Sequence, residues 1–202
     1  MRIHLLAVAA VLVAGSTPLL ADSFVPYSTP GSVSAATQMY ATGNTVSAYF
    51  YSSNAGDNDK ISVFDVATGS YLNPMYQLDN HSSVQNGVPV TFSGANMGDL
   101  IAFDLTNSSY GNSTIFSSDP SRSTDGINHG YITPFSGLLG KADISGYYIG
   151  MEDLPFGVSD LDYNDDNFVI SGVTTVPEPG SFVLLATGLL GAAGVVRRRF
   201  AL

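Results

Sequence analysis

Short apolar and aromatic runs, separated by turn-forming residues, recur along residues 22–171. The run 45–51 alternates regularly and places Val46, Ala48 and Phe50 on one face, which is the period-two pattern of a half-buried strand. No stretch of this region keeps the 3.6-residue apolar period of an amphipathic helix. The runs that we predict as strands cover residues 32–40, 45–52, 61–66, 88–92, 99–105, 131–134, 147–151 and 168–171.

Turn signals such as Asn86-Gly87 separate these runs. Eight or so short strands at this spacing predict an all-β fold, with one antiparallel β-sandwich or jelly-roll-like domain over residues 22–171. Residues 106–128 carry few strand signals, and we expect them to form one long surface excursion. Residues 172–180 have the composition of a linker.

The first 21 residues have the pattern of a secretory signal peptide. Met1 and Arg2 form a short positive start, residues 3–15 are almost entirely apolar, and Ala21 is a small residue at the expected cleavage point. This run is too short for a lasting transmembrane helix. We therefore expect the mature body to begin at residue 22 and to be exported.

The C-terminal end combines a short motif, an apolar run and a basic cluster. These parts are Pro177, Glu178 and Pro179, the uncharged run 182–196, and Arg197, Arg198 and Arg199. As a helix the run would span about 22 Å at about 1.5 Å per residue, which is short for a bilayer core of about 30 Å. Because it has no polar face and ends in three arginines, we predict a transmembrane sorting tail over residues 181–202, with a cytoplasmic C-terminus, and not a buried core helix.

This three-part tail resembles the PEP-CTERM sorting signal of Gram-negative bacteria. The resemblance implies that an exosortase, a membrane cysteine protease, is a partner, and that the inner membrane anchors the tail during sorting. It also implies a producer of exopolysaccharide and delivery of the mature protein to the cell surface or to the extracellular matrix of a biofilm. A tail that remains an unprocessed membrane tether is the main alternative.

The body between the two targeting segments is strongly acidic. Residues 22–176 contain three Lys and Arg against sixteen Asp and Glu, a net charge of −13. This balance excludes nucleic-acid binding and docking on anionic lipid, both of which need clustered basic residues. The chain has no cysteine, so the exported fold depends on its core alone and thiolate chemistry is excluded.

Seven acidic or amide side chains crowd into fifteen residues between two apolar runs. They are Glu152, Asp153, Asp160, Asp162, Asn164, Asp165 and Asp166. So much like charge is unfavourable unless solvent or a cation compensates it. Asp160, Asp162 and Asn164 have the i, i+2, i+4 spacing that lets three oxygen side chains converge on one hard cation. Ca²⁺, with six to eight oxygen ligands, suits them better than Mg²⁺.

This segment is not an EF-hand, because Asp165 stands where that loop needs Gly and Ser171 where it needs Glu. We predict a Ca²⁺ site with ligands drawn from Glu152, Asp153, Asp160, Asp162, Asn164 and Asp165. The alternative is a solvated Asp/Asn turn. Residues 54–59 are a weaker second candidate, for which the solvated turn is favoured.

The acidic block also resembles a bacterial domain of unknown function that often accompanies PEP-CTERM tails. The family's Phe-Glu-Asp-Leu is matched by residues 151–154, with Met in place of Phe, and its Asp-x-Asp-Tyr-Asn-Asp by residues 160–165. An upstream Asp-Gly-x-Asn-His is matched by residues 125–129. The resemblance covers about residues 95–171. It implies no established activity, only cation ligands or a carboxylate active site.

No catalytic residue is predicted, because G-x-S-x-G, H-E-x-x-H and phosphate-loop motifs are absent from the sequence. We expect His129 to be a surface-loop histidine and not a catalytic base paired with Asp125. The favoured function is that of an exported structural protein stabilised by Ca²⁺. One alternative is a carbohydrate-binding module that uses Tyr and Phe, although the chain has no Trp. The other is a hydrolase that uses Asp162 and Asp165.

Overall fold

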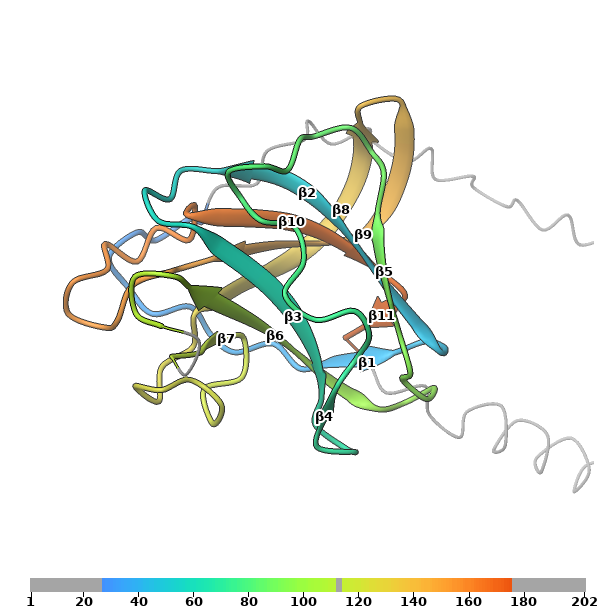
Figure 1. Cartoon of the computed structure of the whole chain (residues 1–202), viewed down its shortest axis with the longest axis horizontal. Helices are drawn as coiled ribbons and strands as arrows, with labels where there is room; N and C mark the ends of the chain where they lie inside the picture. Colours follow the sequence, from blue (N-terminus) through green and yellow to red (C-terminus); the bar gives the residue numbers. More distant parts are fainter. Residues whose placement is uncertain (1–26, 112–113, 176–202) are drawn as a thin grey trace, which may run out of the picture.

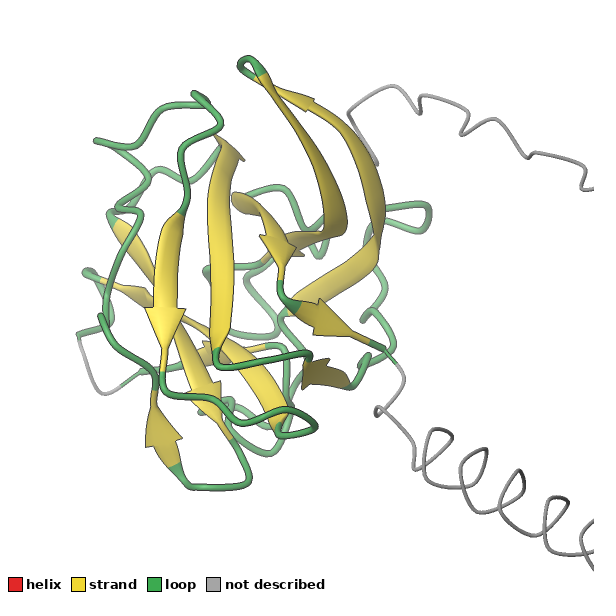
Figure 2. Ribbon diagram, turned by 90° about the vertical axis from the view of Figure 1, so that its right-hand side faces the viewer, coloured by secondary structure: helices red, strands yellow, loops and turns green. Residues whose placement is uncertain are grey.

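The structure, a computed structural model, describes residues 27–111 and 114–175; the expected signal peptide and sorting tail lie outside them. Every regular element of these residues is a strand (Figure 2). The strands are β1 (Met39–Ala41), β2 (Thr45–Ser53), β3 (Asp59–Asp65), β4 (Ser70–Tyr71), β5 (Val90–Ser93), β6 (Leu100–Asn107), β7 (Phe116–Ser117), β8 (Gly130–Leu139), β9 (Ala142–Met151), β10 (Asp166–Ser171) and β11 (Val173–Thr174). Within the described ranges, no helix has the length and apolar character to cross a membrane.

These strands form two antiparallel sheets (Figure 1). The first sheet has the order β11-β1-β6-β3-β4, with β7 paired to β6, and the second has the order β5-β2-β10-β9-β8. The prediction of an all-β, antiparallel fold is confirmed. The chain passes from the second sheet to the first between β2 and β3, so the loop that joins them bridges the two sheets at one end.

The main hydrophobic core is built from both sheets. Ile61 of β3 and Phe103 of β6 come from the first sheet, and Val46 of β2 and Phe168 of β10 from the second, and all four are fully buried. Phe168 also packs against Phe50 in an edge-to-face arrangement, with ring centroids 6.2 Å apart. The period-two alternation of the sequence therefore marks the inward faces correctly.

The strand predictions and the structure differ in the first strand, in three short elements and in one long hairpin. Strand β1 (Met39–Ala41) covers only the end of the predicted run 32–40, because the backbone of Ser34 is hydrogen-bonded to the side chains of Tyr163 and Asn128. Strands β4, β7 and β11 have two residues each, too few to show an alternating pattern. Strand β7 lies in the expected surface excursion, and β11 in the expected linker. Strands β8 and β9 are longer than predicted, because their pairing with each other extends through Gly, Ser and Asp positions of low β-propensity.

The segment that carries β7 is held to the first sheet by a buried ion pair. Arg122 donates to the carboxylate of Asp104, whose side chain is 0% exposed. Ser117 and Tyr71 donate to the same carboxylate at 2.6 and 2.9 Å. The Arg122 guanidinium also lies 3.2 Å from the ring centroid of Phe64. The predicted surface excursion is thus anchored by one charged contact that the sequence pattern does not reveal.

Candidate functional site

The acidic side chains gather at the end of the two sheets where β3 and β10 begin. In the second sheet Asp166 stands between its pairing partners Ser53 and Met151, which are the last residues of β2 and β9. In the first sheet Asp59 pairs with Asn107, the last residue of β6. This end of the molecule therefore combines residues from both sheets and from both halves of the chain.

Two loops lie side by side at this end, on the left of Figure 1: residues 54–58 after β2 and residues 152–165 after β9. The backbone N–H groups of Asn54 and Ala55 both donate to the carbonyl of Asp165, at 2.9 and 3.1 Å. The stronger and the weaker acidic segments of the sequence thus come together, although about a hundred residues separate them.

Three of the predicted ligands, Glu152, Asp160 and Asp162, converge, and we call them the outer carboxylate group. Each has one carboxylate oxygen within 4.8 Å of those of the other two. Ca²⁺ binds oxygen at about 2.3–2.6 Å, so two ligands of one ion lie at most about 5 Å apart. Glu152 is buried, Asp162 is half-buried and Asp160 is exposed, which leaves the group open on one side.

The 152–165 loop folds around the Glu152 side chain. The Ser159 hydroxyl and the Tyr163 N–H donate to its two carboxylate oxygens. Leu161 and Tyr163 adopt left-handed backbone conformations, with φ of 54° and 56°, and turn the chain back toward Glu152. Gly150 permits the close approach, because a Cβ there would lie 2.2 Å from the Tyr163 carbonyl oxygen. The loop is therefore shaped by its contacts with β9.

Asn164 lies beside the outer carboxylate group and turns its nitrogen atoms toward it. Its backbone N–H donates to Asp162 Oδ1 at 3.1 Å, and its side-chain amide nitrogen donates to Asp162 Oδ2. Its side-chain oxygen accepts a hydrogen bond from Asn54 at 3.0 Å. In this arrangement Asn164 orients the Asp162 carboxylate, while the outer group supplies the anionic oxygens.

The remaining predicted ligands, Asp153 and Asp165, belong with two other carboxylates, Asp59 and Asp166. We call these four the inner carboxylate group. The N–H of Asp153 donates to Asp165 Oδ2 at 3.1 Å. The amide of Asn107 donates to Asp153 Oδ2 at 3.2 Å. Five of the six predicted ligands are therefore divided between two neighbouring groups, and the sixth, Asn164, orients Asp162.

Asp59 and Asp166 enter the inner group because they occupy core-facing positions of their strands. Asp59 is two residues from Ile61, and Asp166 is two residues from Phe168; both apolar partners lie in the main core. Alternate residues of a strand share a face, so both carboxylates lie on the same face as the core side chains of their strands. The predicted ligand set omitted Asp166, and Asp59 belonged only to the weaker candidate at residues 54–59. The signal in the sequence that could have identified them is their spacing of two residues from an apolar residue of the core.

Burial dominates the electrostatics of both groups. It raises the pKa of Glu152 to about 7, and together with Asp153 it raises the pKa of Asp165 to about 7. Burial and the nearby Asp59 raise the pKa of Asp153 to about 6. The pKa values of Asp59 and Asp166 are both raised, again chiefly by burial. Such shifts are expected where several carboxyls share a poorly solvated space.

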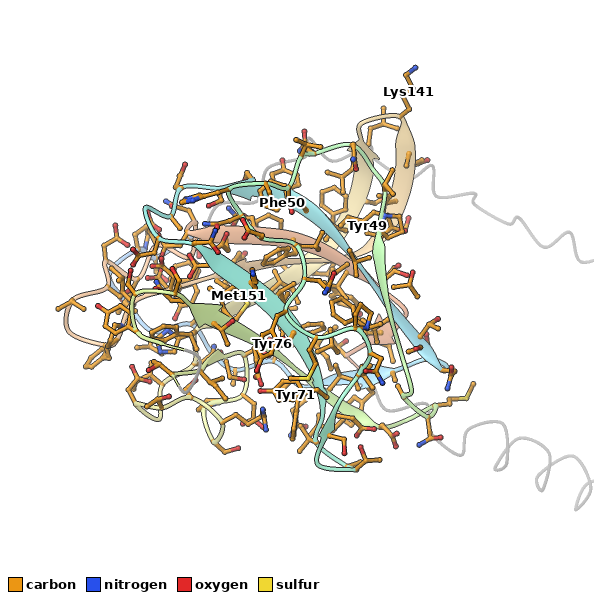
Figure 3. All side chains as sticks on the ribbon, viewed as in Figure 1. Tyr49, Phe50, Tyr71, Tyr76, Lys141 and Met151 are labelled. Carbon is orange, nitrogen blue, oxygen red and sulfur yellow. The ribbon has the colours of Figure 1, made fainter. Side chains whose placement is uncertain are left out.

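The basic side chains of the described residues are engaged or lie elsewhere. Lys60 forms an ion pair with Asp79 at 3.9 Å, and Arg122 is held by Asp104. Lys141 projects from the tip of the β8–β9 hairpin, at the top of Figure 3 and away from the acidic end. Within the described ranges, compensation of the carboxylates by a lysine or arginine is therefore absent.

A pH titration of stability, in the presence of a chelator, tests the repulsion within these groups. Carboxyls whose pKa values rise from 3.8 to between about 6 and about 8 hold protons in the folded state that the unfolded chain has released. Their stabilisation is complete below pH 3.8 and is lost as the pH rises through 6 to 8. We expect the free energy of unfolding to fall by on the order of 1 kcal/mol per pH unit between about pH 6.5 and 8.5. Denaturant unfolding at each pH measures this slope.

The control for this titration is Asp166→Asn, which removes one buried carboxyl and should flatten the slope. Above about pH 6.5 the opposing effect of His129 is absent, because its lowered pKa affects stability only below that value. A free energy of unfolding that stays constant or increases with pH over this range would contradict the assignment of raised pKa values.

His129 is buried, so the expectation of a surface-loop histidine is wrong. Its backbone N–H donates to the Ser117 carbonyl at 2.9 Å, and its ring packs 4.8 Å from that of Phe116. Its Nε2 lies 3.1 Å from both carboxylate oxygens of Asp125. Asp125 in turn accepts the N–H of Phe156 at 2.8 Å. The pair therefore connects the segment before β8 with the 152–165 loop.

The fold and the site together define an acidic, all-β protein with carboxylates concentrated at one end. Residues 175–199 match the PEP-CTERM protein-sorting motif. Residues 93–172 match a domain of unknown function, DUF4114. Both resemblances drawn from the sequence are confirmed. Neither a curated protein nor a solved structure matches the chain. The sorting motif implies an exported protein that an exosortase sorts at the membrane.

Proposed function

We propose that this exported protein is a structural component of the cell surface or the polysaccharide matrix, with a β-sandwich body that Ca²⁺ stabilises. The observation that carries the proposal is the convergence of Glu152, Asp160 and Asp162 to within 4.8 Å. One Ca²⁺ at these oxygens would offset the repulsion among them and hold the 152–165 loop against β9. The role is mechanical, because a tightened loop makes an exported domain without disulfides harder to unfold.

The arrangement supports a cation better than it supports the hydrolase alternative. Asp162 and Asp165, the two carboxylates considered for catalysis, belong to different groups. Asp165 also accepts the N–H of Asp153, and its carbonyl is occupied by Asn54 and Ala55. These contacts serve to fix the two loops together, which is a structural task.

A calcium titration of the full-length chain in mild detergent, after treatment with a chelator, tests the proposed function. At a free Ca²⁺ concentration of about 100 times Kd, binding to the folded state alone adds about 2.7 kcal/mol. For a protein of this size we expect Tm to rise by roughly 5–10 °C. The double variant Asp160→Asn/Asp162→Asn should lose the part of this rise that the outer carboxylate group supplies, because it removes two of the three charges of that group.

The matched control is Asp143→Asn, an exposed aspartate of the β8–β9 hairpin, which should keep the full calcium response. Mg²⁺ at the same concentration should produce a smaller rise, since it tolerates irregular oxygen sets poorly. The proposal fails if Ca²⁺ leaves the Tm of the unmodified chain unchanged, or if the double variant responds as strongly as the unmodified chain.

A further inference from the structure

Asp166 is a buried carboxylate without a donor. Its side chain is 0% exposed, and among the described residues neither of its oxygens accepts a hydrogen bond. The Oδ1 of Asp59, a residue that is 1% exposed, likewise accepts none from this part of the chain. Buried carboxylates normally have several donors, because an uncompensated buried charge is costly. Either a proton or a cation must therefore neutralise these oxygens.

The two carboxyls, one from each sheet, are close neighbours. Asp59 and Asp166 lie within hydrogen-bonding reach of one another, a contact that two carboxylates can use only when one of them carries a proton. Asp153 lies beside Asp59 as a third carboxyl. Ser53 is close enough to lower the pKa of Asp166, but its hydroxyl does not have the geometry of a hydrogen bond.

The chemistry of these ligands selects a hard cation. All the charged atoms are carboxylate oxygens. The amide nitrogens of Asn80 and Asn107 donate to Asp59 and Asp153, and the Ser53 hydroxyl lies near Asp166. Sets of oxygen without nitrogen or sulfur donors suit Ca²⁺ and Mg²⁺ rather than zinc or copper. A shared proton would neutralise one carboxyl of the pair, whereas a divalent cation neutralises both and also attracts Asp153.

We propose that Asp59 and Asp166 form a second Ca²⁺ site between the two sheets, with Asp153 beside Asp59 as a further negative charge. This inference does not rest on the proposed function, because the outer carboxylate group is formed by residues of the 152–165 loop alone. The inner site joins different elements: Asp59 begins β3 of the first sheet, and Asp166 begins β10 of the second. A cation there connects the two sheets directly, at the end of the hydrophobic core.

The inner site also links the two halves of the chain. Asp153 and Asp166 lie within the residues that match the domain of unknown function, whereas Asp59 lies outside them. The site is complete only when the strands before residue 93 are in place. Calcium binding at the inner group therefore reports the assembled two-sheet body and not the 152–165 loop alone.

Calcium stoichiometry distinguishes the inner site from the outer one. Equilibrium dialysis of the full-length chain in mild detergent, with radioactive Ca²⁺, is expected to give two bound ions per chain. Asp59→Asn/Asp166→Asn should bind one, and Asp160→Asn/Asp162→Asn should bind the other. Both variants keep side-chain shape, and near-ultraviolet circular dichroism checks that each is folded. Asp65→Asn, a fully buried aspartate at the other end of β3, is the matched control and should still bind two.

The possible results separate the two sites. If Asp59→Asn/Asp166→Asn binds as much calcium as the unmodified chain, the inner site is overturned, and a proton shared by the pair is the remaining account. If that variant loses one ion while Asp160→Asn/Asp162→Asn loses none, the inner site stands and the outer one fails.

Hydrogen exchange provides a second test of the inner site. Ca²⁺ should slow amide exchange by at least tenfold at the residues that follow Asp59 in β3 and Asp166 in β10. Unchanged exchange rates there would contradict the inner site.

Discussion

Replacing Arg122 with alanine is expected to lower the free energy of unfolding by about 3–5 kcal/mol, because the change leaves a buried charge without its partner. Asp104 is 0% exposed, and Arg122 is its cationic neighbour, 17% exposed at the side chain. The remaining donors, Ser117 and Tyr71, are neutral. Alanine also removes the guanidinium from the face of Phe64. Denaturant unfolding of the variant measures the loss.

Two further variants separate the buried charge from lost packing. Lys141→Ala removes a basic side chain from the exposed hairpin tip and should change stability by less than about 0.5 kcal/mol. The pair Asp104→Asn/Arg122→Met removes both charges and should recover a large part of the loss, as expected when the cost comes from an unpaired ion. A loss below about 1 kcal/mol in Arg122→Ala would mean that solvent reaches Asp104.

The second large effect is expected from Phe168→Ala, at about 3–5 kcal/mol. Phe168 is 0% exposed, lies in the third strand of the five-stranded sheet, and packs against Phe50. Its removal creates a cavity between the two sheets, which paired strands on either side prevent from collapsing. Because Phe168 follows Asp166 by two residues on the same face, calcium affinity should fall as well. Urea unfolding and calcium titration measure the two effects.

The matched control is Phe156→Ala in the 152–165 loop, a residue that is 57% exposed. The same substitution there should cost less than about 0.5 kcal/mol, since little apolar area is lost from the interior. If the two variants were equally stable, the core between the sheets would not be the main source of stability that the burial pattern indicates.

The boundaries of the matched domain have a structural consequence. Residues 93–172 contain β6 to β10 and omit β2 and β3. Strand β2 stands between β5 and β10, and β3 stands between β6 and β4. Both missing strands are interior members of their sheets, so the matched segment alone would expose long unpaired edges of β6 and β10. The strands before residue 93 are therefore integral to this body.

Local patterns in the sequence were sufficient for the class of fold and for the C-terminal sorting motif. Alternation along residues 45–51 identifies a strand because neighbouring side chains point to opposite faces. The motif at residues 177–179 and the arginines at residues 197–199 are each unbroken in the sequence, so they can be recognised without knowledge of the fold. The crowding of Asp160, Asp162 and Asp165 is likewise visible in one short segment.

The division of the acidic residues into two groups depended on strand pairing across the whole chain. Asp59 and Asp166 are more than a hundred residues apart, and they meet because β3 and β10 begin at the same end of two facing sheets. The burial of His129 and the pairing of Asp104 with Arg122 also depend on the tertiary structure. Each follows from contacts between distant segments, for which a local pattern of apolar and polar residues carries no information. The physical reason is that the alternation of a strand specifies which face a side chain occupies, while pairing and packing specify what lies opposite to it.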